Sequence, residues 1–253
     1  PERRSRLISD REKKIIAYHE VGHAIVAKVL PDSDPVHKIS IIPRGHAALG
    51  YTLQLPEEDR FLRSRSDLLN RISILLSGRV AEEIVFGDVT SGAANDLERS
   101  TQTARQMVTE LGMSERLGLV KLGNKHEEIF LGRDISEERN YSEEIAYAID
   151  QEVKAIIDSC YDKARAILEE HRELMDRIAG ILLEREVLDR SEFDVLMEGG
   201  ELPPRSAKKT EASKPAADGD AKAPDGGPEK GQDLTPPLPE NRVDGLPKDG
   251  LLG

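Results

Sequence analysis

The sequence predicts a mainly α-helical domain that carries a small β-sheet, and three observations support this fold class. Several long stretches place apolar residues at intervals of three and four, the periodicity of amphipathic helices. Two short segments instead alternate apolar and polar residues, as half-buried strands do. Residues 201–253 hold nine of the 14 prolines and no Phe, Tyr, Ile or Met. That composition cannot bury a core, so we expect the folded part to end near residue 200.

The first predicted element is a helix over residues 10–30. Ser9 and Glu12 have the spacing of a capping box, in which each side chain accepts a hydrogen bond from the other residue's backbone. Gly22 interrupts the helical run at a cost of about 1 kcal/mol relative to alanine. A glycine kept at that cost indicates close packing at this point of the helix.

The remaining elements follow from the same two periodicities and from Gly and Pro stop signals. Two strands are predicted over 37–43 and 49–56, joined by a turn at 44–46. A helix over 66–86 stops at Gly87, and the next helix is capped by Asn95 or a near neighbour and runs to about residue 111. An irregular segment over 112–133 follows, then a helical stretch over 141–185 with a break near His171 and a short helix over 189–197. The two strands form one small antiparallel element.

The most informative motif is the run His-Glu-Val-Gly-His at residues 19–23. On a helix, His19 and His23 lie on one face and one turn apart, so both imidazoles can bind one metal ion with Glu20 beside them. This arrangement is typical of metal-assisted hydrolysis, in which the glutamate acts as the general base. The alternative is a pair of core histidines that hydrogen-bond to backbone carbonyls.

A catalytic zinc needs a third protein ligand, and the residues alone leave three candidates. Glu82 and Glu83 lie near the end of the helix predicted over 66–86, where many zinc proteases place a carboxylate. Asp96 enters the next helix, and a helix cap is its simpler interpretation. Spacing does not decide between these three side chains.

Composition excludes several classes of protein. The formal charge of −12 and the absence of a separate basic cluster argue against nucleic-acid binding. A single cysteine, Cys160, excludes an internal disulfide and a cysteine-rich zinc module. No stretch approaches 18 consecutive apolar residues, so we expect this fragment to be soluble and to lack a membrane span.

Five ordered motifs resemble the peptidase domain of the FtsH family of membrane-anchored AAA proteases. They are His-Glu-Val-Gly-His at 19–23, Asp-Pro-Val-His-Lys at 34–38, Leu-Gly-Tyr at 49–51, Gly-Arg-Val-Ala-Glu-Glu at 78–83 and Ser-Gly-Ala-Ala-Asn-Asp-Leu at 91–97. The resemblance covers roughly residues 5–198. Val21, Ser91 and Ala94 differ from the residues usual in the family, but these small changes should not alter metal binding. His46 stands where the family more often has Arg, and we assign it no function.

The resemblance implies that His19, His23 and Asp96 bind Zn²⁺ and that Glu20 is the catalytic base. Glu82 and Glu83 would then lie behind the ligands, where one of them could orient a histidine. The implied reaction is endoproteolysis of unfolded, misfolded or membrane proteins.

The resemblance also implies a domain organisation and a cellular setting. Residues 1–8 would link to an upstream ATPase module that uses ATP and Mg²⁺, residues 9–200 would be the zinc metallopeptidase domain, and residues 201–253 a disordered Pro/Gly-rich tail. Neither a phosphate-binding loop motif nor a membrane anchor occurs in this sequence. The full-length protein is expected to be a homo-hexamer at the cytoplasmic face of the inner membrane.

Two further expectations concern how a substrate would bind. A polypeptide could add as a strand to the edge formed around residues 50–53, and His37 could supply a second contact to the oxyanion. The rival functions are an assembly module that mainly builds the ring and a binding protein with a purely structural zinc. A structural site would be closed by four protein ligands.

Overall fold

The computed structural model describes residues 9–43, 49–56, 62–123 and 140–204. All of them fall in the first of two units into which the chain divides, Pro1–Pro204 and Arg205–Gly253. The predictions made for residues 1–8, for the turn at 44–46, for residues 124–133 of the irregular segment and for the tail from 205 onwards lie outside the described residues.

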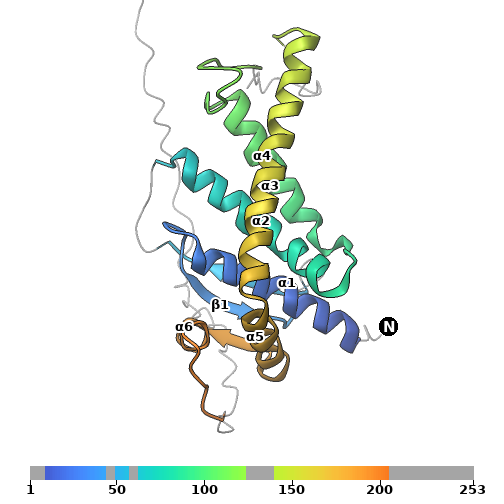
Figure 1. Cartoon of the computed structure of the whole chain (residues 1–253), viewed down its shortest axis with the longest axis vertical. Helices are drawn as coiled ribbons and strands as arrows, with labels where there is room; N and C mark the ends of the chain where they lie inside the picture. Colours follow the sequence, from blue (N-terminus) through green and yellow to red (C-terminus); the bar gives the residue numbers. More distant parts are fainter. Residues whose placement is uncertain (1–8, 44–48, 57–61, 124–139, 205–253) are drawn as a thin grey trace, which may run out of the picture. The chain divides into compact units, whose positions relative to one another are not determined.

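The described part is mainly helical with one small antiparallel sheet, as predicted (Figure 1). Its helices are α1 (Asp10–Val29), α2 (Arg65–Phe86), the 3₁₀ turn η1 (Ser91–Ala93), α3 (Ala94–Thr109), α4 (Glu143–Glu170), α5 (Arg172–Arg185) and α6 (Arg190–Met197). Its strands are β1 (Val36–Ser40), β2 (Tyr51–Gln54) and β3 (Val187–Asp189). Within these residues no helix is both long and apolar enough to cross a membrane.

Helix α1 begins and packs as the sequence predicts. Ser9 and Glu12 form the capping box, with both reciprocal hydrogen bonds present. At Gly22, a Cβ atom would lie 2.7 Å from the carbonyl oxygen of Ser77 and 2.8 Å from the Cβ of Ala81. Glycine therefore allows α1 and α2 to touch through their backbones, which confirms the close packing inferred for this position.

The sheet has one strand more than we predicted. Its order is β2-β1-β3, and both neighbours run antiparallel to β1, with Ile39 opposite Thr52 on one side and Leu188 on the other. The third strand, Val187–Asp189, is too short to show an alternating pattern in the sequence. It pairs with the edge of β1 that β2 does not occupy. Strand β2 lies at the other edge of the sheet.

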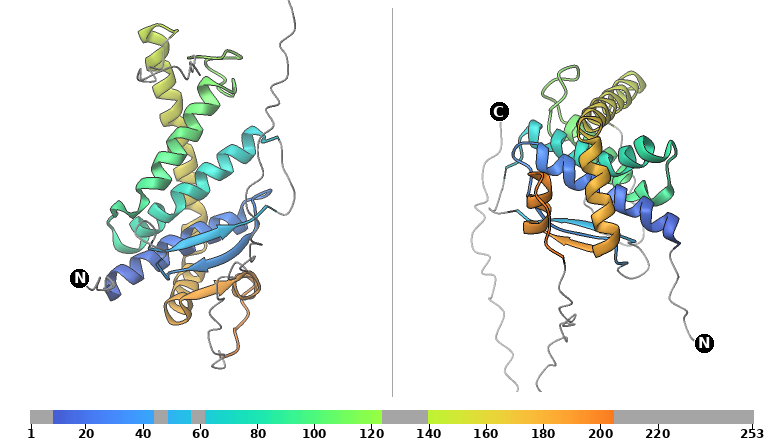
Figure 2. Two further views of the ribbon diagram at one scale, coloured as in Figure 1. Left: turned by 180° about the vertical axis from the view of Figure 1, so that it is seen from behind. Right: turned by 60° about the horizontal axis from the view of Figure 1, so that its bottom comes forward.

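Helix α1 lies between the sheet and α2, while α3 and α4 pack on α2 (Figure 2). Two hydrophobic clusters fill these layers. One is built around Ile25, Ile39 and Phe193 from α1, β1 and α6, and the other around Ile72 and Met107 from α2 and α3. Helix α1 is thus covered on both sides, and its side chains are fixed by packing.

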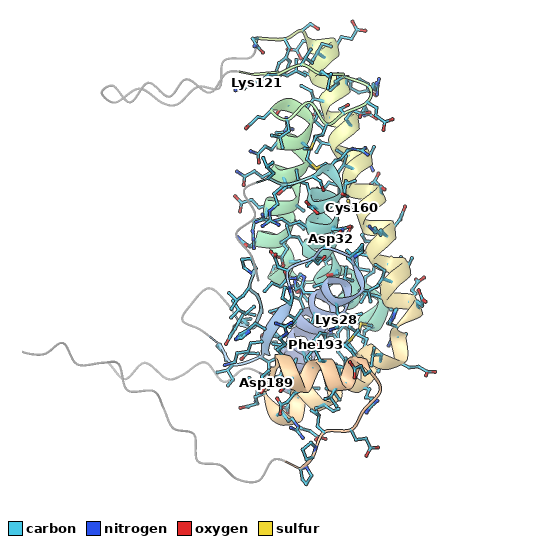
Figure 3. All side chains as sticks on the ribbon, turned by 90° about the vertical axis from the view of Figure 1, so that its left-hand side faces the viewer. Lys28, Asp32, Lys121, Cys160, Asp189 and Phe193 are labelled. Atoms are coloured by element: carbon cyan, nitrogen blue, oxygen red, sulfur yellow. The ribbon has the colours of Figure 1, made fainter. Side chains whose placement is uncertain are left out.

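Helix α6 packs near the C-terminal end of α1 (Figure 3). Phe193 is fully buried there, and the Lys28 ammonium lies 2.6 Å from a carboxylate oxygen of Asp194. The short helix predicted over 189–197 begins one residue later, at Arg190, and the Asp189 side chain caps it. The C-terminal end of the described chain therefore holds α1 in place.

The long helical stretch breaks at His171, between α4 and α5, as predicted. Helix α2 also stops as expected, at Gly87, which has a φ of 65°. The expected cap of α3 by Asn95 or a near neighbour is wrong: its N-cap residue is Ala93, and no side chain caps it. The 3₁₀ turn η1 leads directly into α3, and the capping side chain belongs instead to that turn, where Thr90 accepts from the backbone N–H of Gly92.

Candidate metal centre

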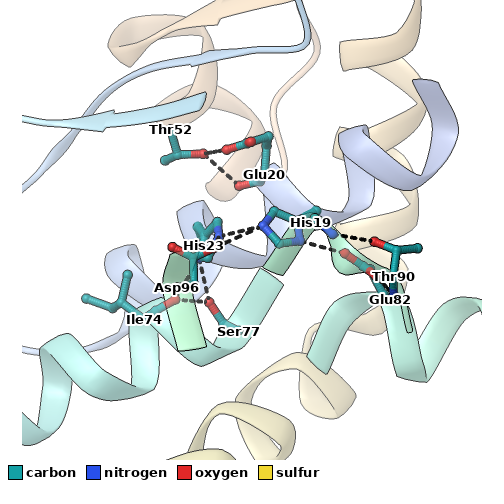
Figure 4. A network of polar contacts seen from close by, with 10 residues as sticks. His19, Glu20, His23, Thr52, Ile74, Ser77, Glu82, Thr90 and Asp96 are labelled. Carbon is teal, nitrogen blue, oxygen red and sulfur yellow. Dashed lines mark hydrogen bonds and ion pairs between the residues drawn. The ribbon is translucent and has the colours of Figure 1, made fainter. Parts of the chain in front are cut away.

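His19 and His23 lie one turn apart on α1, and each side chain is 12% exposed (Figure 4). Nδ1 of His23 is 2.7 Å from the backbone carbonyl oxygen of Ile74, and Nδ1 of His19 is 2.7 Å from Oε1 of Glu82. A carbonyl oxygen can only accept, so Nδ1 of His23 carries the proton and donates. With Nδ1 of each ring engaged in this way, the Nε2 atoms are the ones available to bind a metal ion.

The two Nε2 atoms and one carboxylate oxygen of Asp96 converge on a single point. Nε2 of His19 is 3.0 Å from Nε2 of His23, and Oδ2 of Asp96 is 3.3 Å and 3.4 Å from these atoms. Four-coordinate zinc with bonds of about 2.0–2.1 Å separates its ligand atoms by roughly 3.3–3.4 Å. Atoms with lone pairs held this close repel one another unless a proton or a metal ion lies between them, so the donor set fits a metal ion.

Gly78 on α2 makes room for the two imidazoles. A Cβ atom at this position would lie 2.6 Å from Cε1 and Nε2 of His19 and 2.6 Å from Nε2 of His23. The sequence reasoning did not single out this residue. Its signal was a glycine inside a predicted helix, the same signal that drew attention to Gly22.

The paired glutamates separate into different environments. Oε1 of Glu82 contacts Nδ1 of His19, and Oε2 accepts from the backbone N–H of Thr90 at 2.8 Å. Glu83 instead accepts from the hydroxyl of Tyr161 at 2.6 Å and from Arg165 at 3.2 Å, both on α4. Glu82 thus orients a histidine, and Glu83 joins two helices away from the centre.

Asp96 lies in the first turn of α3, but its carboxylate faces the imidazoles. Its interpretation as a simple helix cap is therefore not supported. Burial disfavours the ionised form of Asp96, yet the hydrogen bonds to His19 and His23 hold the pKa of Asp96 well below its usual value. Asp96 enters the centre as an anion.

The charges around His19 shift its titration in the metal-free chain. Burial lowers the pKa of His19, but hydrogen bonds to Asp96 and Glu82 and the nearby charge of Glu20 raise it, and the net value is about 9. The same contact with His19 lowers the pKa of Glu82 against the opposing effect of its burial. The surroundings of His19 therefore favour a positive charge at this point, whether it comes from a proton or a metal ion.

Glu20 follows His19 on α1 and is 7% exposed. The hydroxyl of Thr52 on β2 lies 2.7 Å from Oε2 of Glu20 and 3.0 Å from its backbone carbonyl oxygen, and can donate to either. A Cβ atom on Gly50 would lie 2.9 Å from Oε1 of Glu20. Strand β2 therefore passes directly over the carboxylate. Thr52 was not predicted as a site residue; the one signal for it in the sequence is its place directly after the Leu-Gly-Tyr motif.

The centre opens into a groove with a volume of about 1260 Å³. His19, Glu20, His23 and Asp96 line it together with all of β2 and parts of α2 and α3. His37 does not line this groove and is exposed on β1, so the structure does not support a role for it at the oxyanion. The side chains of consecutive strand residues point to opposite faces, which explains why closeness in sequence misled here.

Comparisons with known proteins agree with this geometry. The sequence model of peptidase family M41 matches residues 6–196 of this chain. The chain is 58% identical over 193 residues to the ATP-dependent zinc metalloprotease FtsH of Thermotoga maritima, covering 76% of this chain and 32% of that protein. It is 53% identical over 215 residues to ATP-dependent zinc metalloprotease FtsH 3 of Symbiobacterium thermophilum, covering 85% and 34%.

The chain spans about a third of the length of these relatives. The matched region nevertheless includes every residue of the candidate centre, from His19 to Asp96. A family match over most of the described residues, together with identities above 50%, is decisive for membership. The chain therefore belongs to peptidase family M41.

Proposed function

We propose that this chain is a zinc-dependent metalloendopeptidase that hydrolyses peptide bonds of unfolded, misfolded or membrane proteins. The observation that carries the proposal is the convergence of His19, His23 and Asp96 on one point, with the Glu20 carboxylate beside them in an open groove. The family is one of peptidases, and the printed names of the relatives describe zinc metalloproteases.

The donor set favours zinc at a catalytic rather than a structural site. Two imidazole nitrogens and one carboxylate oxygen are ligands that zinc accepts readily. Among the described residues, the group that could hold a metal contains three side chains, whereas structural zinc sites have four. An open fourth position is what hydrolysis requires.

Zinc bound by these residues would supply Lewis acidity, polarising the scissile carbonyl and lowering the pKa of a water molecule to about 7. Thr52 donates to Oε2 of Glu20, which leaves Oε1 to take the proton from that water. Glu20 then delivers the proton to the nitrogen of the leaving amine. Glu82 and the carbonyl of Ile74 keep the two imidazoles oriented throughout.

Strand β2 offers a place for an extended substrate. It is an edge strand of the sheet, and all four of its residues, Tyr51–Gln54, line the groove. A polypeptide that adds to this edge would be held through main-chain hydrogen bonds, which depend little on side-chain identity. Such binding suits a protease that accepts many unfolded chains.

The resemblance extends this proposal to the full-length protein. We expect an upstream ATPase module that uses ATP and Mg²⁺, a membrane anchor that places the protein at the cytoplasmic face of the inner membrane, and a homo-hexameric assembly. The printed names of the relatives include ATP dependence. The mass of the full-length protein, measured in detergent by light scattering, would test the hexamer.

Zinc content and hydrolysis of unfolded casein, each measured with and without a chelator, test the activity. Glu20→Gln should keep stoichiometric zinc but lose cleavage by at least about a hundredfold, because the amide of glutamine cannot take the proton from water. Asp96→Ala should lose zinc. Full cleavage by Glu20→Gln, or full zinc content in Asp96→Ala accompanied by zinc loss in Glu82→Ala, would overturn the assigned roles.

A further inference from the structure

Three arginines gather along one part of the groove. Arg63 precedes α2, Arg71 lies on α2 and Arg99 lies on α3, and all three line the cavity. Arg63 pairs with Asp34 at 3.8 Å. In the part of the chain that the structure describes, the guanidinium groups of Arg71 and Arg99 have no hydrogen bond or ion pair.

The positive charges of these three arginines repel one another. Burial, together with the charges of Arg99 and Arg63, lowers the pKa of Arg71, and Asp34 opposes this effect only in part. Besides Asp34 and the carboxylates of the metal centre, those of Glu12, Asp32 and Asp67 line the same groove and have interactions of their own. Glu12 accepts from the backbone N–H of Ser9 in the cap of α1, and Asp67 from that of Ser64 in the cap of α2. Among the described residues, the guanidinium groups of Arg71 and Arg99 thus keep their hydrogen-bond donors unpaired, in a chain whose net charge is −12.

The two free arginines lie close to the metal centre along their helices. Arg99 follows Asp96 by three residues, a rise of about 4.5 Å along α3. Arg71 precedes Ile74, whose carbonyl holds His23, by the same spacing on α2. In the view of Figure 4, Thr52 of β2 and Asp96 lie on opposite sides of the histidines. Arg71 and Arg99 line the same groove as all of β2, so a polypeptide on β2 would share the groove with these arginines.

We propose that Arg71 and Arg99 form a subsite for an acidic side chain of the substrate, within about three residues of the scissile bond. An extended chain advances about 3.3–3.6 Å per residue, so side chains at this distance can reach one helical turn beyond the ligands. A guanidinium group binds a carboxylate through two parallel hydrogen bonds, which a neutral amide cannot reproduce. The subsite rests on the proposed peptidase function and adds a preference that main-chain binding alone does not give.

The test uses zinc-loaded protein and fluorogenic peptides with amidated C-termini, so that only side-chain carboxylates are compared. A single Glu, Gln or Lys is placed in turn at each of three positions on either side of the bond that is cut. At one or two positions, kcat/KM for the Glu peptide should exceed that for the Gln peptide by about fivefold at low salt, the upper range for an exposed ion pair. The Lys peptide should be cut more slowly than the Gln peptide, and added salt should reduce both differences.

Variants identify the residues responsible. Arg71→Gln and Arg99→Gln should each reduce the Glu/Gln ratio, and the double variant should bring it close to one. The matched control is Arg105→Gln on the same helix α3, because Arg105 lies outside this groove and pairs with Asp150 on α4. It should keep the wild-type ratio. A ratio of one at every position in the wild type, or a ratio that the double variant leaves unchanged, would refute the subsite.

A binding measurement separates this proposal from the proposed function. In the Glu20→Gln background, which should not cleave, labelled Glu and Gln peptides are compared by fluorescence anisotropy with and without the two arginine changes. Tighter binding of the Glu peptide that depends on the arginines would support the subsite even if the wild type cleaved nothing. Equal cleavage of all peptides by the wild type, together with equal binding, would leave the peptidase assignment intact and exclude the subsite.

Discussion

Replacing Gly78 with alanine tests whether the space behind the two imidazoles is essential for metal binding. The added Cβ would lie 2.6 Å from three ring atoms, including the Nε2 atoms of His19 and His23. Ordinary contacts of this kind begin at 3.4 Å, so the rings or the helices must move apart by 0.8 Å. Metal ligands must be held within about 0.5 Å of their productive positions.

The displacement exceeds that tolerance, so we expect the zinc affinity of Gly78→Ala to fall by about a hundredfold, or about 2.7 kcal/mol. The stability of the metal-free fold should change much less. Overpacking costs about 1–3 kcal/mol, while alanine recovers up to about 1 kcal/mol of helix propensity. A loss of affinity much larger than the loss of stability would therefore identify the metal centre as the point of strain.

Chelator competition gives the zinc Kd, and urea unfolding of the metal-free protein gives the stability. The matched control is Gly180→Ala in α5, where an added Cβ would meet no heavy atom within 4 Å. This variant should keep the wild-type zinc Kd and gain about 0.5–1 kcal/mol of stability. If Gly78→Ala bound zinc as tightly as the wild type, the geometric reasoning for the centre would be wrong.

Three further predictions follow from contacts around the centre. Glu82→Gln should weaken zinc binding by about 10–100-fold, because Nδ1 of His19 loses its charged partner, whereas Glu83→Gln should leave the zinc Kd unchanged; equal effects would refute the different roles. Thr52→Val should lower kcat by roughly tenfold with zinc content unchanged, and Thr52→Ser should restore it; an unaltered kcat in the valine variant would show that the hydroxyl does not position the base. In metal-free protein, the raised pKa of His19, about 9 against 6.5 for a free histidine, contributes stability that is complete below pH 6.5 and is lost as the pH rises through 9. The melting temperature should therefore fall over this range in the metal-free protein and fall less when zinc is bound.

Local signals in the sequence predicted most of the helices. The capping box at Ser9 and the stop at Gly87 both depend on residues within one turn of the helix end, so they can be read without knowing the fold. The missed strand β3 depends on a distant partner instead. Its three residues pair with β1, almost 150 positions earlier, and carry no periodicity of their own.

The choice of Asp96 as the third candidate ligand also depends on contacts between residues that are distant in sequence. Spacing left Glu82, Glu83 and Asp96 as comparable carboxylates, and only the resemblance to a family favoured Asp96. The difference lies in where the start of α3 sits relative to α1: Asp96 contacts the Nε2 atoms of both histidines, and Glu82 contacts Nδ1 of one. The relative placement of two helices is a tertiary property that no short pattern contains.

The pairing of β3 with β1 also has a consequence for biosynthesis. Residues 36–40 leave the ribosome long before residues 187–189, and at about 5–20 residues per second the interval is roughly 7–30 s. During that time one edge of β1 has no native partner and can pair with another nascent chain. Premature termination before β3 should therefore yield aggregation-prone fragments, even though the whole of the candidate metal centre has already been translated.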